Sequence, residues 1–246
     1  MVKIISIFKN MSSLIIKQSN NNHLKSSTGG LKKAVYSNLI NSINHERYSS
    51  QTISELAMIS ESAKIAEDAT ICDGVYVGEN VVIGSKTRLY PGAIILNDCI
   101  IQNNVNIGSG TVIGGEGFGY YYHKPTGTIR HNPHIGRVII KDNVDINSNV
   151  SIHRASIGDT IIGKNTKINS NTHIAHNVII GENCLIMAGV SISGSAIIGD
   201  NVVINPKAGI AKHLKIGDNS IIGMNSTVLD NVPPNVRVLG TPAIEK

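Results

Sequence analysis

The stretch "IGKNTKINSNTHIAHNVIIGENCLI", residues 162–186, repeats one pattern every six residues, with isoleucine at positions 162, 168, 174, 180 and 186. A helix cannot keep this period on one face, because six residues advance it by about 600° and leave successive positions about 120° apart. An amphipathic strand alternates with a period of two. Repeats of six residues are the sequence signature of a parallel β-helix, so this stretch predicts an all-β solenoid.

The same period extends over most of the chain. Aliphatic residues recur in sixes from Ile59 to Ile113, from Ile140 to Ile152 and from Ile162 to Val228. Three hexads make one triangular coil of 18 residues, so the 25 hexads predict about eight coils and a prism roughly 40 Å tall at the usual strand spacing. Asn and Gly follow the aliphatic residues, as in "GEN" and "GKN", because the corners need left-handed backbone angles.

Two interruptions break the repeat. Residues 118–137 form an excursion loop that holds four of the nine aromatic residues, Phe118, Tyr120, Tyr121 and Tyr122. Irregular loops of this length are usually functional, and a tolerated insertion is the alternative. A smaller slip at 154–161 adds four residues between Ile152 and Ile162.

The repeat also sets the domain boundaries. Residues 51–232 are predicted to form the β-helix, and residues 233–246 to form a cap that covers its open end. Residues 1–50 lie outside the repeat; within them, Leu31, Val35, Leu39 and Ile43 follow a helical stripe, so this segment is predicted to be partly helical or flexible.

Composition excludes several classes of protein. The chain is 41% hydrophobic and 16% charged, which fits a globular protein rather than a disordered or membrane-spanning one. The net charge of +5 contains no block of Lys and Arg, so we expect no nucleic-acid partner. No apolar run is long enough for a transmembrane segment, and the three cysteines, without a C-x-x-C motif, favour reduced thiols in a cytoplasmic protein.

Stacking arithmetic places several chemically useful side chains around His176. Positions 18 residues apart stack in a regular coil, so Gly194 lies directly above His176. Allowing for the four-residue slip, Arg154 lies below it, and His213 lies two coils up on the same edge. His173 and His153 are expected nearby. Imidazole suits general-base catalysis near neutral pH, although a lone corner histidine is more often a solvated surface residue.

Four motifs carry a family resemblance. "GGEGFGY" (114–120), "PHIGRVII" (133–140), "DTIIG" (159–163) and "IAHNVIIG" (174–181) together resemble the UDP-3-O-acylglucosamine N-acyltransferases of lipid A biosynthesis, within the hexapeptide-repeat acyltransferase superfamily. The resemblance implies a left-handed parallel β-helix, a homotrimer with active sites between subunits, and transfer of an acyl group to the amine of a nucleotide-linked amino sugar. The donor would be acyl carrier protein or coenzyme A carrying the acyl thioester.

The resemblance also assigns roles to residues. It implies that His176 is the general base, that His213 lies near the acceptor, and that Gly194 lines the acyl passage, where its N–H would stabilise an oxyanion. Candidate substrate-binding residues therefore comprise His213, Gly194, Phe118, Tyr120, His173 and Arg154. No metal ligand and no permanently bound cofactor are expected.

Other readings remain open at this level. The C-terminal "VPPNVRVLGTPA" resembles acetyltransferases that use acetyl-CoA, and the family's carboxylate one turn before the base is replaced by Asn169. A metal hydratase of the γ-carbonic-anhydrase kind uses the same solenoid, with His173 and His176 as candidate ligands. A purely structural solenoid needs neither the aromatic loop nor the histidines.

Overall fold

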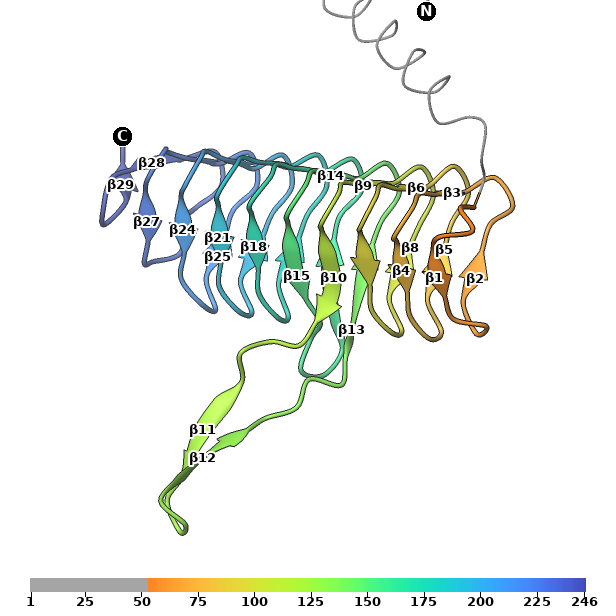
Figure 1. Ribbon diagram of the computed structural model, residues 1–246. Coiled ribbons are helices and arrows are strands. Elements are labelled where there is room, and N and C mark those ends of the chain that lie inside the picture. The colour runs from red at the N-terminus through yellow and green to blue at the C-terminus, as the bar shows by residue number, and fades with distance from the viewer. Residues whose placement is uncertain (1–52) are drawn as a thin grey trace, which may run out of the picture. The chain divides into compact units, whose positions relative to one another are not determined.

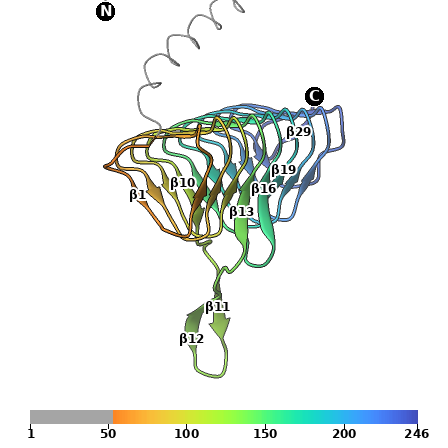
Figure 2. The same cartoon turned by 90° about the vertical axis from the view of Figure 1, so that its right-hand side faces the viewer.

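The computed structural model describes residues 53–246, and in them the chain winds into a parallel β-helix of stacked triangular coils (Figure 1). Residues 51–246 form a compact unit of their own. The end view in Figure 2 shows the three-sided outline of the coils. The predicted fold class is confirmed for these residues, while the segment 1–50 and its expected helical stripe lie outside the described residues.

Each side of the prism is one sheet, and consecutive strands along the chain pass from one sheet to the next. The first sheet holds β1 (Met58–Ile59), β4 (Tyr76–Val77), β7 (Ile94–Ile95), β10 (Val112–Gly115), β15 (Ser151–His153), β18 (His173–Ile174), β21 (Ser191–Ile192), β24 (Gly209–Ile210) and β27 (Thr227–Val228). The second sheet holds β2 (Lys64–Ile65), β5 (Val82–Ile83), β8 (Ile100–Ile101), β13 (Arg137–Ile140), β16 (Asp159–Ile162), β19 (Ile179–Ile180), β22 (Ile197–Ile198) and β25 (Lys215–Ile216). The third sheet holds β3 (Thr70–Ile71), β6 (Arg88–Leu89), β9 (Asn106–Ile107), β14 (Asp145–Ile146), β17 (Lys167–Ile168), β20 (Leu185–Ile186), β23 (Val203–Ile204), β26 (Ile221–Ile222), β28 (Arg237–Leu239) and β29 (Ile244–Glu245).

The inward-pointing aliphatic column is the core. Every one of the 25 repeat positions predicted from the sequence lies in a strand, and all are buried except Ile59 and Ile65, which are partly exposed on the first coil. Their equivalents stack in register, as in the pairing of Ile174 with Ile152 and Ile192. Burying this much aliphatic surface, at about 25 cal/mol per Å², is what offsets the entropy cost of ordering such short strands.

The prism is longer than the hexads alone predict. The three sheets contain nine, eight and ten strands, which are the 25 hexad strands together with the C-terminal β28 and β29. Ile53 bridges to Ile71 at the first coil, and Val232 bridges to Ile216 at the last. The end of the chain adds β28, parallel to β26, and β29 turns back against β28 in antiparallel fashion.

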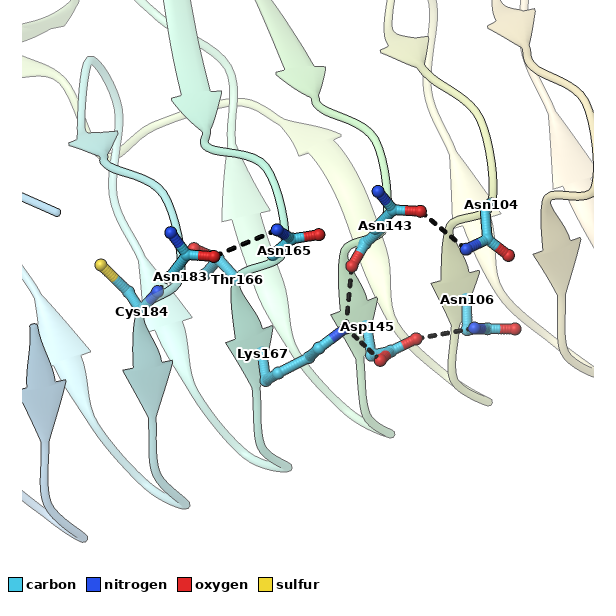
Figure 3. Close-up of polar contacts among 9 residues, drawn as sticks. All are labelled: Asn104, Asn106, Asn143, Asp145, Asn165, Thr166, Lys167, Asn183 and Cys184. Carbon is cyan, nitrogen blue, oxygen red and sulfur yellow. Dashed lines mark hydrogen bonds and ion pairs between the residues drawn. The ribbon is translucent and has the colours of Figure 1, made fainter. Parts of the chain in front are cut away.

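Asparagines hold the corners. Of the 17 non-glycine residues with positive φ among residues 53–246, 12 are Asn, which tolerates the left-handed conformation better than most side chains. Neighbouring corners are joined by side-chain hydrogen bonds, such as Asn104 Nδ2 to Asn143 Oδ1 (2.7 Å) and Asn165 Nδ2 to Asn183 Oδ1 (3.0 Å), visible in Figure 3. These bonds satisfy polar groups between coils and fix the register of the stack.

Polar side chains also form ladders on the outer face of the third sheet. Asp145 accepts a hydrogen bond from Asn106 Nδ2 (2.6 Å) on the coil below, and Lys167 on the coil above lies 2.5 Å from its carboxylate (Figure 3). The Lys167 ammonium donates a second bond to the carbonyl of Asn143 (2.8 Å). Because both charged side chains are substantially exposed, the pair adds little to stability and instead marks a solvated face.

The expected irregular loop is a β-hairpin. The chain leaves the first sheet after β10, forms the antiparallel pair β11 (Tyr120–His123) and β12 (Thr128–His131), and rejoins the second sheet at β13. The excursion therefore spans residues 116–136, close to the predicted 118–137, and projects from one corner of the prism (Figures 1 and 2). The four-residue slip is confirmed by the pairing of Ile140 with Ile162, 22 residues apart.

Candidate active site

The predicted site residues lie along one edge of the prism. Arg154, His176, Gly194 and His213 all follow a strand of the first sheet and precede a strand of the second, and the hairpin leaves from this same corner. Backbone hydrogen bonds join the coils here, from Ser195 N to His176 O (3.0 Å) and from His213 N to Gly194 O (3.1 Å). The stacking order predicted from sequence spacing is therefore the order in the structure.

Asn177 fixes the imidazole of His176. His176 Nδ1 lies 3.1 Å from Asn177 Oδ1. The Asn177 amide is oriented by its own bonds: Nδ2 donates to the carbonyl of Ile157 (2.9 Å), and Oδ1 accepts from the backbone N–H of Ser156 (2.9 Å). Because an amide oxygen only accepts, Nδ1 of His176 must carry the proton. The neutral ring then presents Nε2 as its proton-accepting atom.

Gly194 supports the same ring from above. A Cβ at Gly194 would lie 2.7 Å from His176 Nε2 and 2.8 Å from Cε1, closer than any ordinary contact. The imidazole of His176 therefore occupies the space that a side chain at position 194 would fill. The glycine is required for this packing and not for backbone freedom, since its φ lies outside the left-handed region.

Arg154 donates hydrogen bonds to two backbone carbonyls of the prism. Its Nε donates to the carbonyl of Gly114 (2.8 Å) and an Nη2 hydrogen bond reaches the carbonyl of Asn97 (2.9 Å). Both carbonyls belong to lower coils at the same corner, just where the chain departs into the hairpin. The guanidinium therefore ties the hairpin's point of departure to the prism, and a contact to substrate stays a prediction.

His173 pairs with His153 on the neighbouring coil. Their rings meet edge to face with centroids 4.7 Å apart, on the outer face of the first sheet beside the His176 corner. Burial, with the neighbouring His173 and His176 acting in the same direction, lowers the pKa of His153 from 6.5 to about 4. Burial also lowers the pKa of His173. Both rings are therefore neutral at pH 7 and offer one donor and one acceptor each.

His134 completes the site and was not among the predicted residues. It is 4% exposed, and its ring meets that of His176 edge to face at 4.8 Å. Gly117 and Gly119 cover it so closely that a Cβ at either would lie 2.6 or 2.5 Å from the ring. Burial lowers the pKa of His134, and the adjacent His176 adds to the effect. Only the return of the chain from the hairpin brings "PHIGR" to this corner, which the repeat period does not predict.

Aromatic rings continue from the base of the hairpin outward. Phe118 and Tyr120 lie 4.8 Å apart, and Tyr120 lies 5.1 Å from His131. Phe118 is 87% exposed and Tyr120 is 54% exposed, so these rings offer open faces to a ligand. The predicted substrate-binding pair thus stands on the same ring series that reaches His134 and His176.

His213 occupies a strained corner. Its φ of 62° places it in the left-handed position where Asn177 and Ser195 stand on the coils below. Residues other than Gly and Asn adopt this conformation only at a cost in stability. The exposed imidazole and the neighbouring Lys212 project from the same edge as His176, two coils further along.

The residues that could bind a metal ion differ from the pair predicted for a hydratase. Among residues 53–246, Glu116, His131 and His134 each bring one ligand atom within 4.8 Å of the others. His173 and His176, the pair considered for a hydratase, are not in this group. Within the same part of the chain, no helix is long and apolar enough to cross a membrane.

Comparisons with known proteins identify the class to which this fold and edge belong. Residues 80–115, 159–194 and 195–230 match the family described as "Bacterial transferase hexapeptide (six repeats)". A UDP-3-O-acylglucosamine N-acyltransferase from Hydrogenovibrio crunogenus is 38% identical over 93 residues, which are 38% of this chain and 26% of that protein. The aligned part thus spans about a quarter of the length of the curated relatives.

Solved structures cover far more of the fold. The UDP-N-acetylglucosamine O-acyltransferase (LpxA) of Moraxella catarrhalis is 30% identical, with a TM-score of 0.73 over 80% of this chain and 74% of that one. LpxA from Acinetobacter baumannii gives 29% identity and a TM-score of 0.72 over the same shares. The chain belongs to the hexapeptide-repeat acyltransferases, and its β-helix is left-handed as predicted.

Proposed function

We propose that this protein transfers an acyl group from a thioester carrier to the amine of a nucleotide-linked amino sugar, as a step in the synthesis of lipid A or another surface glycan. The observation that carries the proposal is the fixed imidazole of His176. Its Nδ1 is held by Asn177, and its Nε2 side packs against Gly194 on the edge from which the aromatic hairpin projects.

His176 acts as the general base. As the sugar amine attacks the thioester carbonyl, it must lose a proton, and Nε2 of the neutral ring accepts it. The Nδ1–H···Oδ1 bond to Asn177 keeps the ring in the required tautomer and stabilises its orientation. The proton then leaves with the thiolate of the carrier, which restores the neutral base without a covalent enzyme intermediate.

Gly194 is the proposed oxyanion donor. Its carbonyl accepts from His213 N, but within residues 53–246 its own N–H has no hydrogen-bond acceptor. A free backbone N–H next to the base is suited to the negative charge that develops on the thioester oxygen. This assigns two functions to one residue: room for the imidazole and a donor for the tetrahedral intermediate.

The acceptor is proposed to bind against the hairpin. Phe118 and Tyr120 offer flat exposed faces to a sugar or a base, while His173 and His213 flank His176 along the edge. The curated relatives are named N-acyltransferases, whereas the solved structures are O-acyltransferases. The motifs around His176 favour an amine as the acceptor. Transfer to a hydroxyl group instead would replace the amine in this proposal.

A cytoplasmic homotrimer is part of this proposal. The second sheet, whose strand β19 follows His176, carries a ladder of aliphatic residues on its outer face: Val82, Ile100, Ile139, Ile161, Ile179 and Ile197. Three of them are 37 to 40% exposed, an apolar stripe that a neighbouring prism would cover. Light scattering is expected to give three chains per particle; a stable, active monomer would contradict it.

The activity test offers the purified chain two donors and a panel of acceptors. Acetyl-CoA and a 3-hydroxyacyl carrier protein are each combined with UDP- and dTDP-linked amino sugars and with UDP-N-acetylglucosamine. Mass spectrometry of the product then separates amide from ester formation. We expect an amide, with His176→Ala reducing kcat by about 10² to 10⁴ while the melting temperature stays close to that of wild type. Absence of transfer to every acceptor would refute the proposal.

A further inference from the structure

Three side chains at the base of the hairpin point to a function that acyl transfer does not require. Glu116 precedes β11, His131 ends β12, and His134 lies just before β13. One ligand atom from each lies within 4.8 Å of the other two. Glu116 Oε2 is 3.7 Å from His131 Nε2, and Glu116 Oε1 accepts a hydrogen bond from the backbone N–H of His134 (3.1 Å).

His134 supplies an independent observation. The residue is 4% exposed, yet its Nδ1 makes no hydrogen bond of good geometry among the described residues. A buried polar atom without a partner costs about 1 to 3 kcal/mol, and proteins rarely leave one unsatisfied. A metal ion would supply the missing partner.

We propose that Glu116, His131 and His134 bind a divalent transition metal of the zinc type, and that the ion clamps both ends of the hairpin to the corner beneath it. Two imidazoles and one carboxylate are an established donor set for Zn²⁺, which leaves a fourth position for water or a ligand. The backbone N–H of His134 orients the carboxylate, as outer partners of metal ligands commonly do.

Closing the site needs only small movements. Metal–ligand bonds of about 2.0 to 2.1 Å place tetrahedral ligand atoms roughly 3.3 Å apart, so the present separations, none above 4.8 Å, must shorten by at most about 1.5 Å. Glu116 and His131 are both exposed side chains and are free to move, while the buried His134 stays fixed. The clamp would fix the base of the aromatic hairpin next to His176, and it stands or falls independently of the acyl transfer proposed above.

The first experiment measures metal binding to the full chain without an affinity tag. Titration with Co²⁺, followed by the visible absorption of tetrahedral cobalt, and with Zn²⁺ by calorimetry is expected to give one ion per chain. His131→Ala and Glu116→Gln should each weaken binding by about 100-fold or more. His123→Ala is the matched control, because His123 lies in the same hairpin but bonds to Thr126 (2.8 Å) instead. Wild-type affinity in both triad variants, or no stoichiometric uptake by the wild type, would overturn the proposal.

The second experiment reads the clamp itself. Arg130 is exposed and directly precedes His131, whereas Lys124 precedes Pro125 and resists trypsin. Zn²⁺ is expected to slow tryptic cleavage after Arg130 by about 10-fold or more in wild type, because the bound ion stabilises the closed hairpin base. The same addition should leave cleavage of His131→Ala unchanged. Equal rates with and without Zn²⁺ in the wild type would refute the clamp.

Discussion

Gly194→Ala tests whether the position of the His176 imidazole sets the rate. The new methyl group would lie 2.7 Å from Nε2 and 2.8 Å from Cε1, whereas ordinary contacts begin near 3.4 Å. The backbone at Gly194 accepts alanine, and His134 already packs against the ring at 4.8 Å between centroids. The imidazole must therefore shift by about 0.7 Å, and displacements of this order cost up to about 10²-fold in rate. We expect kcat to fall about 30- to 100-fold.

The control is the same substitution on the next coil. A Cβ at Gly209 meets nothing within 4 Å, so Gly209→Ala should keep wild-type kcat. The assay is steady-state acyl transfer with the donor and acceptor found for the wild type, together with thermal melts, in which both variants should remain within about 2 °C of wild type. Unchanged kcat in Gly194→Ala, or an equal loss in Gly209→Ala, would refute the reasoning.

Four further changes probe the same edge. His213→Asn places the favoured residue in a left-handed corner, so the melting temperature should rise by about 1 to 3 °C while acceptor KM increases about 10-fold, as measured by melts and kinetics on one preparation. Replacing residues 120–131 by Asn-Gly closes the chain where Asn132 N already bonds to Gly119 O (2.7 Å); light scattering should show the oligomer intact, and turnover should fall or acceptor KM rise. Because the pKa of His153 drops from 6.5 to about 4 on folding, the unfolded chain binds the extra proton between these values, so stability should fall as pH falls through that window and His153→Gln should flatten the decline in denaturant midpoints. Asn177→Gly keeps the positive φ but removes the oxygen that fixes the tautomer; kcat should drop by about 10-fold or more without loss of fold, and a wild-type rate would show that His176 needs no such partner.

Periodicity predicted the scaffold because one physical cause dominates it. Each hexad must point an aliphatic side chain inward, and every such position, from Ile59 to Val228, lies in a strand. The same arithmetic ordered Arg154, His176 and Gly194 along one edge, since the pairing registers are fixed by the core. The C-terminal end departs from the period because Val232 follows Val228 by four residues instead of six. Val232 therefore pairs with Ile216, and Val238 with Ile222, at a separation of 16 residues instead of 18.

The site was predicted less completely because its missing parts depend on an excursion from the repeat. Antiparallel pairing in β11 and β12 decides where the chain returns, and only that return places His134 against His176. The sequence also did not predict the direction of the side chains. Spacing placed Arg154 below His176, but its guanidinium donates to the carbonyls of Gly114 and Asn97. The six-residue period therefore predicts the order in which residues stack along the edge. The contacts of their side chains depend on where the hairpin leaves and rejoins the repeat.

The corner asparagine shows how a scaffold device can become part of a site. Asn recurs at positive φ throughout the solenoid because its short amide tolerates the left-handed conformation, which needs no function to explain it. Asn177 meets this backbone requirement too, and the slip at residues 154–161 on the coil below supplies Ser156 and Ile157 as partners for its amide. Those bonds orient Oδ1 toward His176, so a residue selected for its backbone angle also sets the proton position on the adjacent ring. The proposed role of His176 as a base therefore needs no carboxylate to orient the imidazole, because Asn177 Oδ1 is a neutral acceptor in that position.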